Sequence, residues 1–180
     1  GKYLITNVNE KKYIGKDILH ASVWKKKDEH MVYNVVYNDG KSKYNYVKRF
    51  SVTSMIKDRW YDVTQGNDNS KILYFTANPN SESEIVDILL NYKSRAKNKK
   101  IIYNFSNISI KRRTSRGNIL TKYRIRAIKQ KMLGASTLGG RKVWLDQNIG
   151  RLNIDNRGVF LGLFNSGDKI IFFYNDGTYE

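Results

Sequence analysis

The chemically distinctive side chains of this protein are basic, and most of them gather in one stretch. The 180 residues carry a net charge of +17, and 16 Lys and Arg residues lie between Asp87 and Asp146 without a single Asp or Glu. Residues 1–87 hold 14 basic and 11 acidic groups, and residues 146–180 hold 3 and 5. An A+T-rich genome would raise lysine throughout, but it would not remove the acids from one stretch. The pattern therefore predicts a polyanionic partner.

Ten of these basic residues are the candidate contacts to nucleic acid. Lys and Arg would contact phosphates and release condensed counterions, which gives binding without base specificity. Strand alternation would place Arg124 and Arg126 on one face. The run Lys93–Lys100 is interpreted either as further contacts or as a flexible basic loop. The ten candidates are Lys111, Arg112, Arg113, Arg116, Lys122, Arg124, Arg126, Lys129, Arg141 and Lys142.

Catalytic patterns are missing from the sequence. The absence of cysteine excludes a thiolate zinc site, and His20 is interpreted as a packed or edge residue on a strand over 18–24. The pair Asp28-Glu29 has no partner cluster that would hold a metal, and Gly139-Gly140 lacks the spacing of a phosphate-binding loop. We therefore predict a domain that is not itself an enzyme and binds no cofactor or metal. No apolar run approaches the ~18 residues of a membrane helix, and no secretory signal is present.

The secondary structure expected around these basic residues is short and β-like. Two runs rich in β-branched and aromatic residues, 31–37 and 44–52, flank Asp39-Gly40, which predicts a hairpin whose glycine supplies a positive φ. The stretch 123–133 fits either a strand or a helix. The sequence thus predicts an all-β fold, with further strands at 72–76, 84–90, 101–105, 108–111, 143–145, 159–164 and 170–174.

A short internal repeat suggests how these strands are organised. Tyr37-Asn38-Asp39-Gly40 recurs as Tyr174-Asn175-Asp176-Gly177, 137 residues later, which is close to three units of ~45 residues, the length of a four-stranded propeller blade. We predict blades at 17–66, 70–140 and 143–180, the last incomplete. Because the chain starts at Gly1 and ends three residues after the second Asp-Gly, we expect it to be a piece of a longer protein.

An ordered set of segments resembles a known family. The resemblance is to the C-terminal domain of the A subunit of bacterial type IIA topoisomerases, nearest to topoisomerase IV and next to gyrase. It covers nearly the whole chain, and it is carried by the segments 15–20, 37–42, 48–50, 73–80, 117–123 and 136–144.

The resemblance implies a fold and a role. The fold is a β-pinwheel over residues 1–180, about half of the full domain, with a basic rim that binds and bends duplex DNA. Its parent would be an ATP-dependent type II topoisomerase of the cytoplasm, associated with the nucleoid. The rim would present DNA to the strand-passage core, while a second A subunit, the B subunit, ATP and magnesium would act elsewhere in that enzyme. The resemblance to gyrase implies a Gln-Arg-Arg-Gly-Gly-Lys-Gly heptapeptide in this domain. It is broken here, because Lys131–Leu138 separates Gln130 from Gly139-Gly140-Arg141-Lys142. This favours topoisomerase IV.

A different class of function stays open at this point. A β-repeat module could instead bind RNA or an acidic protein. RNA sites carry aromatic stacking residues among their cations, and residues 93–142 contain only Tyr103, Phe105 and Tyr123. This composition favours a duplex.

Overall fold

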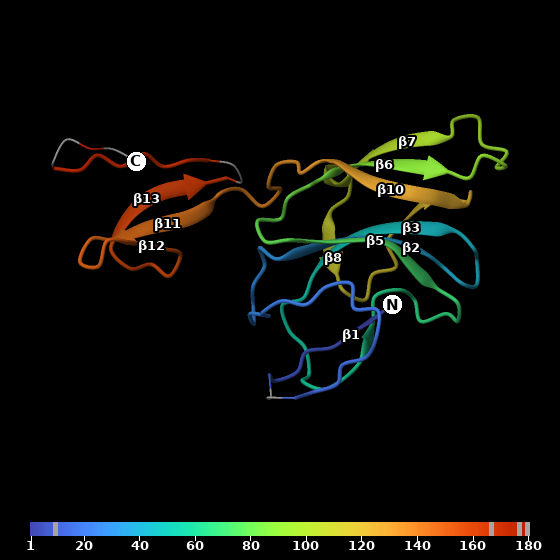
Figure 1. Cartoon of the computed structure of the whole chain (residues 1–180), viewed down its shortest axis with the longest axis horizontal. Helices are drawn as coiled ribbons and strands as arrows, with labels where there is room; N and C mark the ends of the chain where they lie inside the picture. Colours follow the sequence, from blue (N-terminus) through green and yellow to red (C-terminus); the bar gives the residue numbers. More distant parts are fainter. Residues whose placement is uncertain (9–10, 166–167, 176–177, 179–180) are drawn as a thin grey trace. The chain divides into compact units, whose positions relative to one another are not determined.

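Strands make up nearly all the regular structure of the protein in the computed structural model, which describes residues 1–8, 11–165, 168–175 and 178 (Figure 1). These residues form no α-helix, and the 3-10 helix η1 (Phe105–Asn107) interrupts the strands once. The all-β prediction is confirmed. A pinwheel or a repeat of blades is not identified in the described part, and both stay predictions. No helix there is long and apolar enough to cross a membrane.

The chain divides into two compact units, residues 1–137 and 138–180. The predicted blade limits at 17–66, 70–140 and 143–180 stay predictions. The strands of the first unit are β1 (Lys2–Tyr3), β2 (Val32–Asn38), β3 (Asn45–Ser51), β4 (Tyr61–Asp62), β5 (Lys71–Asn78), β6 (Ile85–Leu90), β7 (Lys100–Asn104), β8 (Ile110–Arg112), β9 (Asn118–Thr121) and β10 (Ile125–Met132).

The larger sheet of the first unit is built on the predicted hairpin. β2 and β3 pair antiparallel from Val32↔Ser51 to Asn38↔Asn45, and β5 covers the other edge of β2. Two strands share the outer edge of β3: β8 runs parallel along Arg49–Ser51, and β9 runs antiparallel along Asn45–Val47. One face of this sheet buries a cluster of Val35, Tyr37, Tyr46, Phe50, Val52 and Val63.

The reason for glycine in the hairpin differs from the prediction. The β2–β3 connection spans residues 39–44, and its positive φ belongs to Lys43, at 60°. Gly40 is needed because a Cβ at that position would overlap the carbonyl oxygen of Asp68. Close approach of two backbones, rather than a left-handed conformation, therefore selects this glycine.

The second sheet has the order β10-β6-β7, so the ambiguous stretch 123–133 is a strand. Its inner face buries Val86, Ile88 and Leu90 with Phe105 against Val36 and Val47 of the first sheet. Ile125 and Ala127 pair with the consecutive residues Leu90 and Leu89, which leaves Arg126 as an extra, bulged residue. The alternation predicted for Arg124 and Arg126 is interrupted by this bulge, although both side chains are exposed.

A buried polar network joins the two sheets. The Arg49 guanidinium donates to Asn34 Oδ1 at 3.0 Å and to the carbonyl oxygens of Ser81 and Glu82 at 2.9 and 3.2 Å. Asn34 in turn donates to the Glu84 carboxylate at 3.0 Å. That carboxylate also accepts from Tyr74 at 2.6 Å, from Gln130 at 2.8 Å and from Thr76. Every member is paired, so the network fixes the sheets without leaving a charge isolated.

The second unit contains a sheet of its own with the order β12-β11-β13. These strands are β11 (Arg141–Asp146), β12 (Arg151–Asn153) and β13 (Val159–Phe164). The strand predicted at 170–174 is wrong, because this segment shows only an isolated bridge residue at position 173. Asp176 and Gly177 of the predicted repeat, and the chain end at Glu180, lie outside the described residues.

His20 also differs from its prediction. It lies outside any strand, and its ring lies at centroid distances of 6.2 Å from Tyr33 and 5.7 Å from Phe75. His20 therefore contacts two aromatic rings but is an exposed residue rather than a packed one, and the predicted strand over 18–24 is wrong.

Candidate nucleic-acid interface

The net positive charge belongs entirely to one unit. Residues 1–137 hold 28 basic and 11 acidic residues, a net charge of +17, whereas residues 138–180 hold 5 of each. A polyanion is therefore attracted to the first unit. Arg141 and Lys142, two of the ten candidates, lie on β11 in the neutral unit.

Half of the candidates lie along one edge of the larger sheet. Lys111 and Arg112 are exposed on β8, and Arg113 and Arg116 follow in the connection to β9. Lys122 comes directly after β9. We call these five residues the basic edge. Because β8 and β9 pair with opposite ends of the seven-residue β3, the edge extends over about 20 Å.

Buried groups of the larger sheet hold the basic edge in place. The Lys48 ammonium donates to the carbonyl oxygens of Arg113 and Ser115 at 3.0 and 3.1 Å. The Tyr37 hydroxyl donates to the Arg116 carbonyl oxygen at 2.7 Å. Lys48 is only 2% exposed, and burial lowers its pKa to about 8, against a smaller raising effect of Asp62. The loop is thus tied to the core through its backbone carbonyls, and also through the Arg116 guanidinium, which donates to the Tyr46 hydroxyl at 2.5 Å.

Three of the five cations lie over tyrosine rings, and the loosest of these contacts places the Lys122 ammonium 5.7 Å from the ring centroid of Tyr123. The Arg113 guanidinium carbon lies 4.2 Å from the ring centroid of Tyr61, and that of Arg116 lies 4.6 Å from Tyr46. Burial lowers the pKa of Arg113, but the neighbouring tyrosine hydroxyls outweigh this and raise it overall. The tyrosine rings restrict the orientations of both guanidinium groups.

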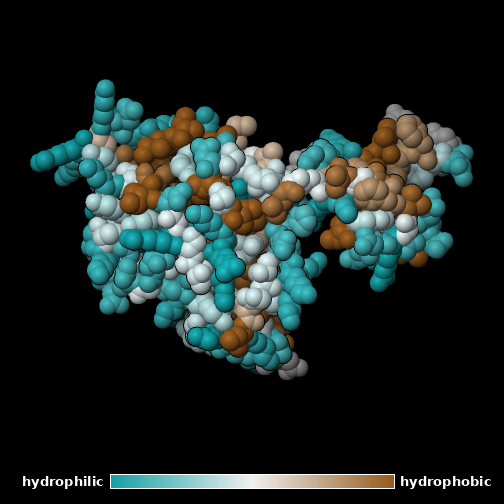
Figure 2. Space-filling model, turned by 180° about the vertical axis from the view of Figure 1, so that it is seen from behind, coloured by the Kyte–Doolittle hydropathy of each residue, from teal (hydrophilic) through white to brown (hydrophobic). Residues whose placement is uncertain are grey.

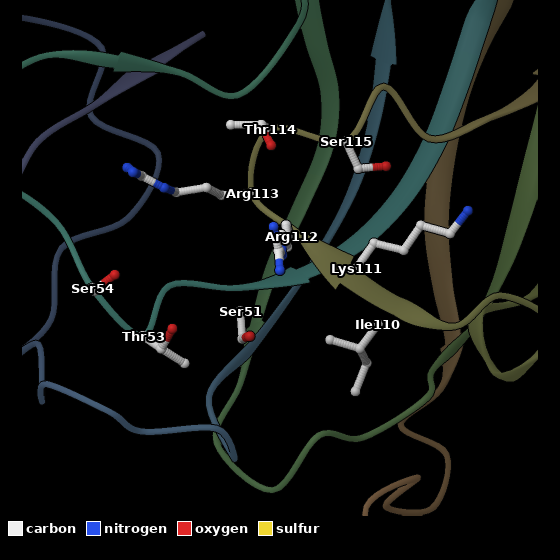
Figure 3. A pocket seen from close by; sticks show the side chains of 9 residues that line it. All are labelled: Ser51, Thr53, Ser54, Ile110, Lys111, Arg112, Arg113, Thr114 and Ser115. Atoms are coloured by element: carbon white, nitrogen blue, oxygen red, sulfur yellow. The ribbon is translucent and has the colours of Figure 1, made fainter.

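A hollow rich in hydroxyl groups opens beside the basic edge (Figure 3). In this view Lys111 and Arg113 extend to opposite sides and Arg112 lies between them. Hydroxyls and guanidinium groups both donate to phosphate oxygens, so the hollow has the chemistry of a phosphate contact. Its lining consists of Ser51, Thr53, Ser54, Ile110, Lys111, Arg112, Arg113, Thr114 and Ser115.

The cations of the first unit are largely not neutralised internally. Among the described residues, the ion pairs join Lys12 and Lys57 to Asp58 and Lys100 to Asp87. None of them uses a member of the basic edge, so its charge is available to a partner.

The remaining candidates of the first unit lie on or beside β10. Arg124 and Arg126 are at its start, and Lys129 pairs across the sheet with Asp87. Lys129 therefore stands next to an acid that Lys100 already contacts at 2.7 Å. The structure thus separates the ten candidates into the basic edge, the β10 group and the pair in the second unit.

Further cations lie near the start of β10, and sequence reasoning missed two of them, Lys41 and Lys43, while it named the run Lys93–Lys100 as either further contacts or a flexible loop. Lys41 and Lys43 lie in the β2–β3 loop, and Lys93, Arg95 and Lys97 lie in the β6–β7 loop, all exposed. The β6–β7 residues carried a signal, since they open the acid-free stretch. Lys41 and Lys43 carried none, because only the tertiary structure brings their loop here.

The described residues show no cluster of three or more His, Cys, Asp or Glu side chains that could hold a metal ion. The geometry of the interface is that of charge and hydrogen-bond donors along an edge, suited to a phosphate backbone.

Comparison with known proteins gives one match. A family model described as the topoisomerase C-terminal domain, Bacteroidota, matches residues 1–132, from the N-terminus to the end of β10. No curated protein and no solved structure matches the chain.

Proposed function

Since the chain belongs to the topoisomerase C-terminal domain family of Bacteroidota, we propose that its first unit binds and bends duplex DNA along the basic edge. The main support is the row of cations on β8, its loop and β9, none of which forms an ion pair within the described part of the chain. An edge of about 20 Å matches roughly six base pairs of a duplex. The contacts are to phosphates, so binding is independent of sequence.

The proposal extends to the role of the parent protein. The chain would serve an A subunit of the topoisomerase IV type, holding a bent duplex for the strand-passage core. ATP hydrolysis, magnesium chemistry, the B subunit and the second A subunit would belong to the rest of that enzyme, which would act on the nucleoid in the cytoplasm.

We further propose that the sheets are blades of a β-pinwheel. Smooth bending of a short site costs about 1–6 kcal/mol, which several phosphate contacts offset.

The test compares two triple variants that remove the same charge. K111Q/R112Q/K122Q neutralises three exposed members of the basic edge, and R151Q/R157Q/K169Q neutralises three exposed cations of the second unit. We expect the first variant to weaken binding to duplex DNA at least about 10-fold. The slope of log K against log salt concentration should become less steep by roughly 0.9 for each phosphate that the protein no longer neutralises. The second variant should bind like the wild type.

Competition by single strands and RNA decides the partner. We expect duplex DNA of any sequence to compete best. Equal losses of affinity in both variants would contradict a defined edge. Preferential binding of RNA or an acidic protein would favour the other class of function.

A further inference from the structure

Three loops of the first unit meet at one end of its sheets, away from β8. The Asn45 side-chain amide donates to the carbonyl oxygens of Thr121 and Tyr123 at 3.1 and 2.7 Å, which joins the β2–β3 hairpin to the β9–β10 turn. The Asn91 backbone amide donates to the Arg124 carbonyl oxygen at 2.8 Å, which joins that turn to the β6–β7 loop. We call residues 39–44, 91–99 and 122–124 the three-loop end. In Figure 1 these loops lie at the right-hand side of the first unit.

The exposed charged side chains of the three-loop end are all cations. Its acid Asp39 is 1% exposed and is turned inward. Burial opposes ionisation of Asp39, but hydrogen bonds from Asn67 and Ser42 lower its pKa to about 2. The exposed acid nearby is Asp68, whose carbonyl packs on Gly40. The exposed cations are Lys41, Lys43, Lys93, Arg95, Lys97, Lys99, Lys122 and Arg124.

The β6–β7 loop is built into the core. Ala96 packs against the buried cluster of the second sheet. The Ser94 backbone amide donates to the Asn91 carbonyl, and the Lys93 backbone amide donates to the Asn91 side chain, both at 2.9 Å. Ser94 and Ala96 are partly buried, and the alternate residues Lys93, Arg95 and Lys97 are exposed. Three cations are therefore held at the surface, and Figure 2 shows hydrophilic side chains projecting from this end of the sheet.

Each of the three loops carries a neighbouring lysine and tyrosine. They are Lys43-Tyr44, Tyr92-Lys93 and Lys122-Tyr123. Tyr92 is 69% exposed and Tyr44 is 40% exposed. The Lys93 ammonium stands 5.8 Å from the ring centroid of Tyr92. A cation beside an exposed ring can bind a phosphate while the ring contacts the adjoining sugar, and tyrosine hydroxyls donate to phosphate oxygens.

We propose that the three-loop end is a second contact surface for the same duplex that follows the basic edge. Lys93, Arg95 and Lys97 contact its phosphates, and Tyr92 packs on its sugar–phosphate backbone. This inference rests on the proposed function and extends it. Lys122 belongs to both surfaces, so the cations continue from one to the other. The footprint is then longer than the roughly six base pairs of the basic edge.

Duplex length separates the two surfaces experimentally. Binding of K93Q/R95Q/K97Q and of the wild-type chain is measured on duplexes of about 8 and about 20 base pairs. We expect the variant to bind the longer duplex at least about 10-fold more weakly and its salt slope to fall by up to about 2.7. On the short duplex, which the basic edge can hold alone, affinity should fall by less than about 3-fold.

The controls keep the inference distinct from the proposed function. R151Q/R157Q/K169Q removes the same charge elsewhere, and Y92F against Y92A tests the ring. Thermal unfolding of every variant should match the wild type, because the substituted side chains are exposed. Unchanged binding of K93Q/R95Q/K97Q to the longer duplex, with weakened binding in K111Q/R112Q/K122Q, would overturn the second surface alone. A wild-type chain that binds no duplex, or only single strands, would overturn both.

Discussion

Lys48 shows how one buried side chain supports a surface function. Its ammonium lies 4.7 Å from the ring centroid of Phe50 and binds the carbonyl oxygens of Arg113 and Ser115. A shorter side chain could not reach both carbonyls from within the sheet, whereas the amine of Lys48 has the two N–H donors that they need whether it is protonated or neutral. The lysine that matters most for the shape of the basic edge is therefore itself hidden from the proposed partner.

The lowered pKa of Lys48 predicts a dependence of stability on pH. Because its pKa is about 8 in the folded protein and about 10.4 when unfolded, the unfolded chain binds more protons between these values. The free energy of unfolding should therefore rise with pH in this window, by about 1–2 kcal/mol from pH 7.5 to 9.5. Denaturant unfolding at several pH values measures it. Above pH 10 buried tyrosines such as Tyr33, whose pKa is raised by burial, work in the opposite direction.

The control for this prediction is the variant K48M, which keeps a long side chain and removes the titrating group. We expect its stability to be nearly flat over the same pH range. A wild-type stability that falls between pH 7.5 and 9.5 would show that the folded protein holds the Lys48 proton more tightly than inferred.

Arg112 and Arg113 are adjacent, but we expect them to respond differently to substitution. R113Q removes a guanidinium that lies on the Tyr61 ring, so we expect unfolding to be easier by about 1–2 kcal/mol. R112Q changes an exposed residue, and its effect on stability should stay within about 0.5 kcal/mol. Thermal or denaturant unfolding distinguishes them. Equal destabilisation would mean that the ring contact contributes nothing.

Pairing of β8 and β9 with the outer edge of β3 determines the position of the basic edge. β8 runs parallel to β3 and β9 antiparallel, so the chain must reverse beside the strand within residues 113–117. The reversal places four basic residues on a short arc. Bulges also bring basic residues to the surface of β10. The register shifts leave Arg126 and Lys131 without a partner on β6, and both residues are exposed.

Gly117 is the residue on which this reversal depends. Its φ is +86°, and a Cβ there would overlap the Val47 carbonyl oxygen. We expect G117A to cost about 1–3 kcal/mol of stability and to weaken duplex binding together with it. Gly139 also has a positive φ, but a Cβ there would meet no atom within 4 Å. G139A should therefore leave duplex binding unchanged. Full DNA affinity in G117A would show that the loop geometry is irrelevant to binding.

For the molecule as a whole, the broken heptapeptide predicts bending without one-handed wrapping. The side chain of Gln130, its first residue, is engaged by the protein itself, because its amide donates to the buried Glu84 carboxylate at 2.8 Å. Eight residues separate Gln130 from Gly139-Gly140-Arg141-Lys142. We expect nicked-circle ligation with saturating protein to give only a small change in linking number, while short bent duplexes close into circles faster. A large shift of one sign would favour a gyrase-type domain.

The two units differ in net charge. All of the net positive charge lies in residues 1–137, which is also where the family match lies. Residues 138–180 are neutral and expose large apolar side chains, among them Phe160, Leu163 and Phe173. Residues 1–137 also expose large apolar side chains, such as Val23 and Trp60, so it is the net charge that distinguishes the first unit and favours DNA binding by it.

The all-β class, the β2–β3 hairpin and the basic composition of the middle third all follow from the amino-acid sequence. These are local properties: β-branched and aromatic runs favour extended backbone, and counting charges needs no coordinates. The order of the motifs also led to the family resemblance, which the match over residues 1–132 supports at the level of the topoisomerase C-terminal domain.

Which basic residues stand together, and which are used internally, is visible only in the folded chain. Lys48 looks like any other lysine of a strand, but strand pairing buries it beneath the loop of Arg113. Lys41 lies 52 residues before Lys93 in the sequence, and hydrogen bonds from Asn45 and Asn91 bring their loops to one end. Strand register and bulges depend on pairing between distant segments, and a local pattern does not encode that pairing.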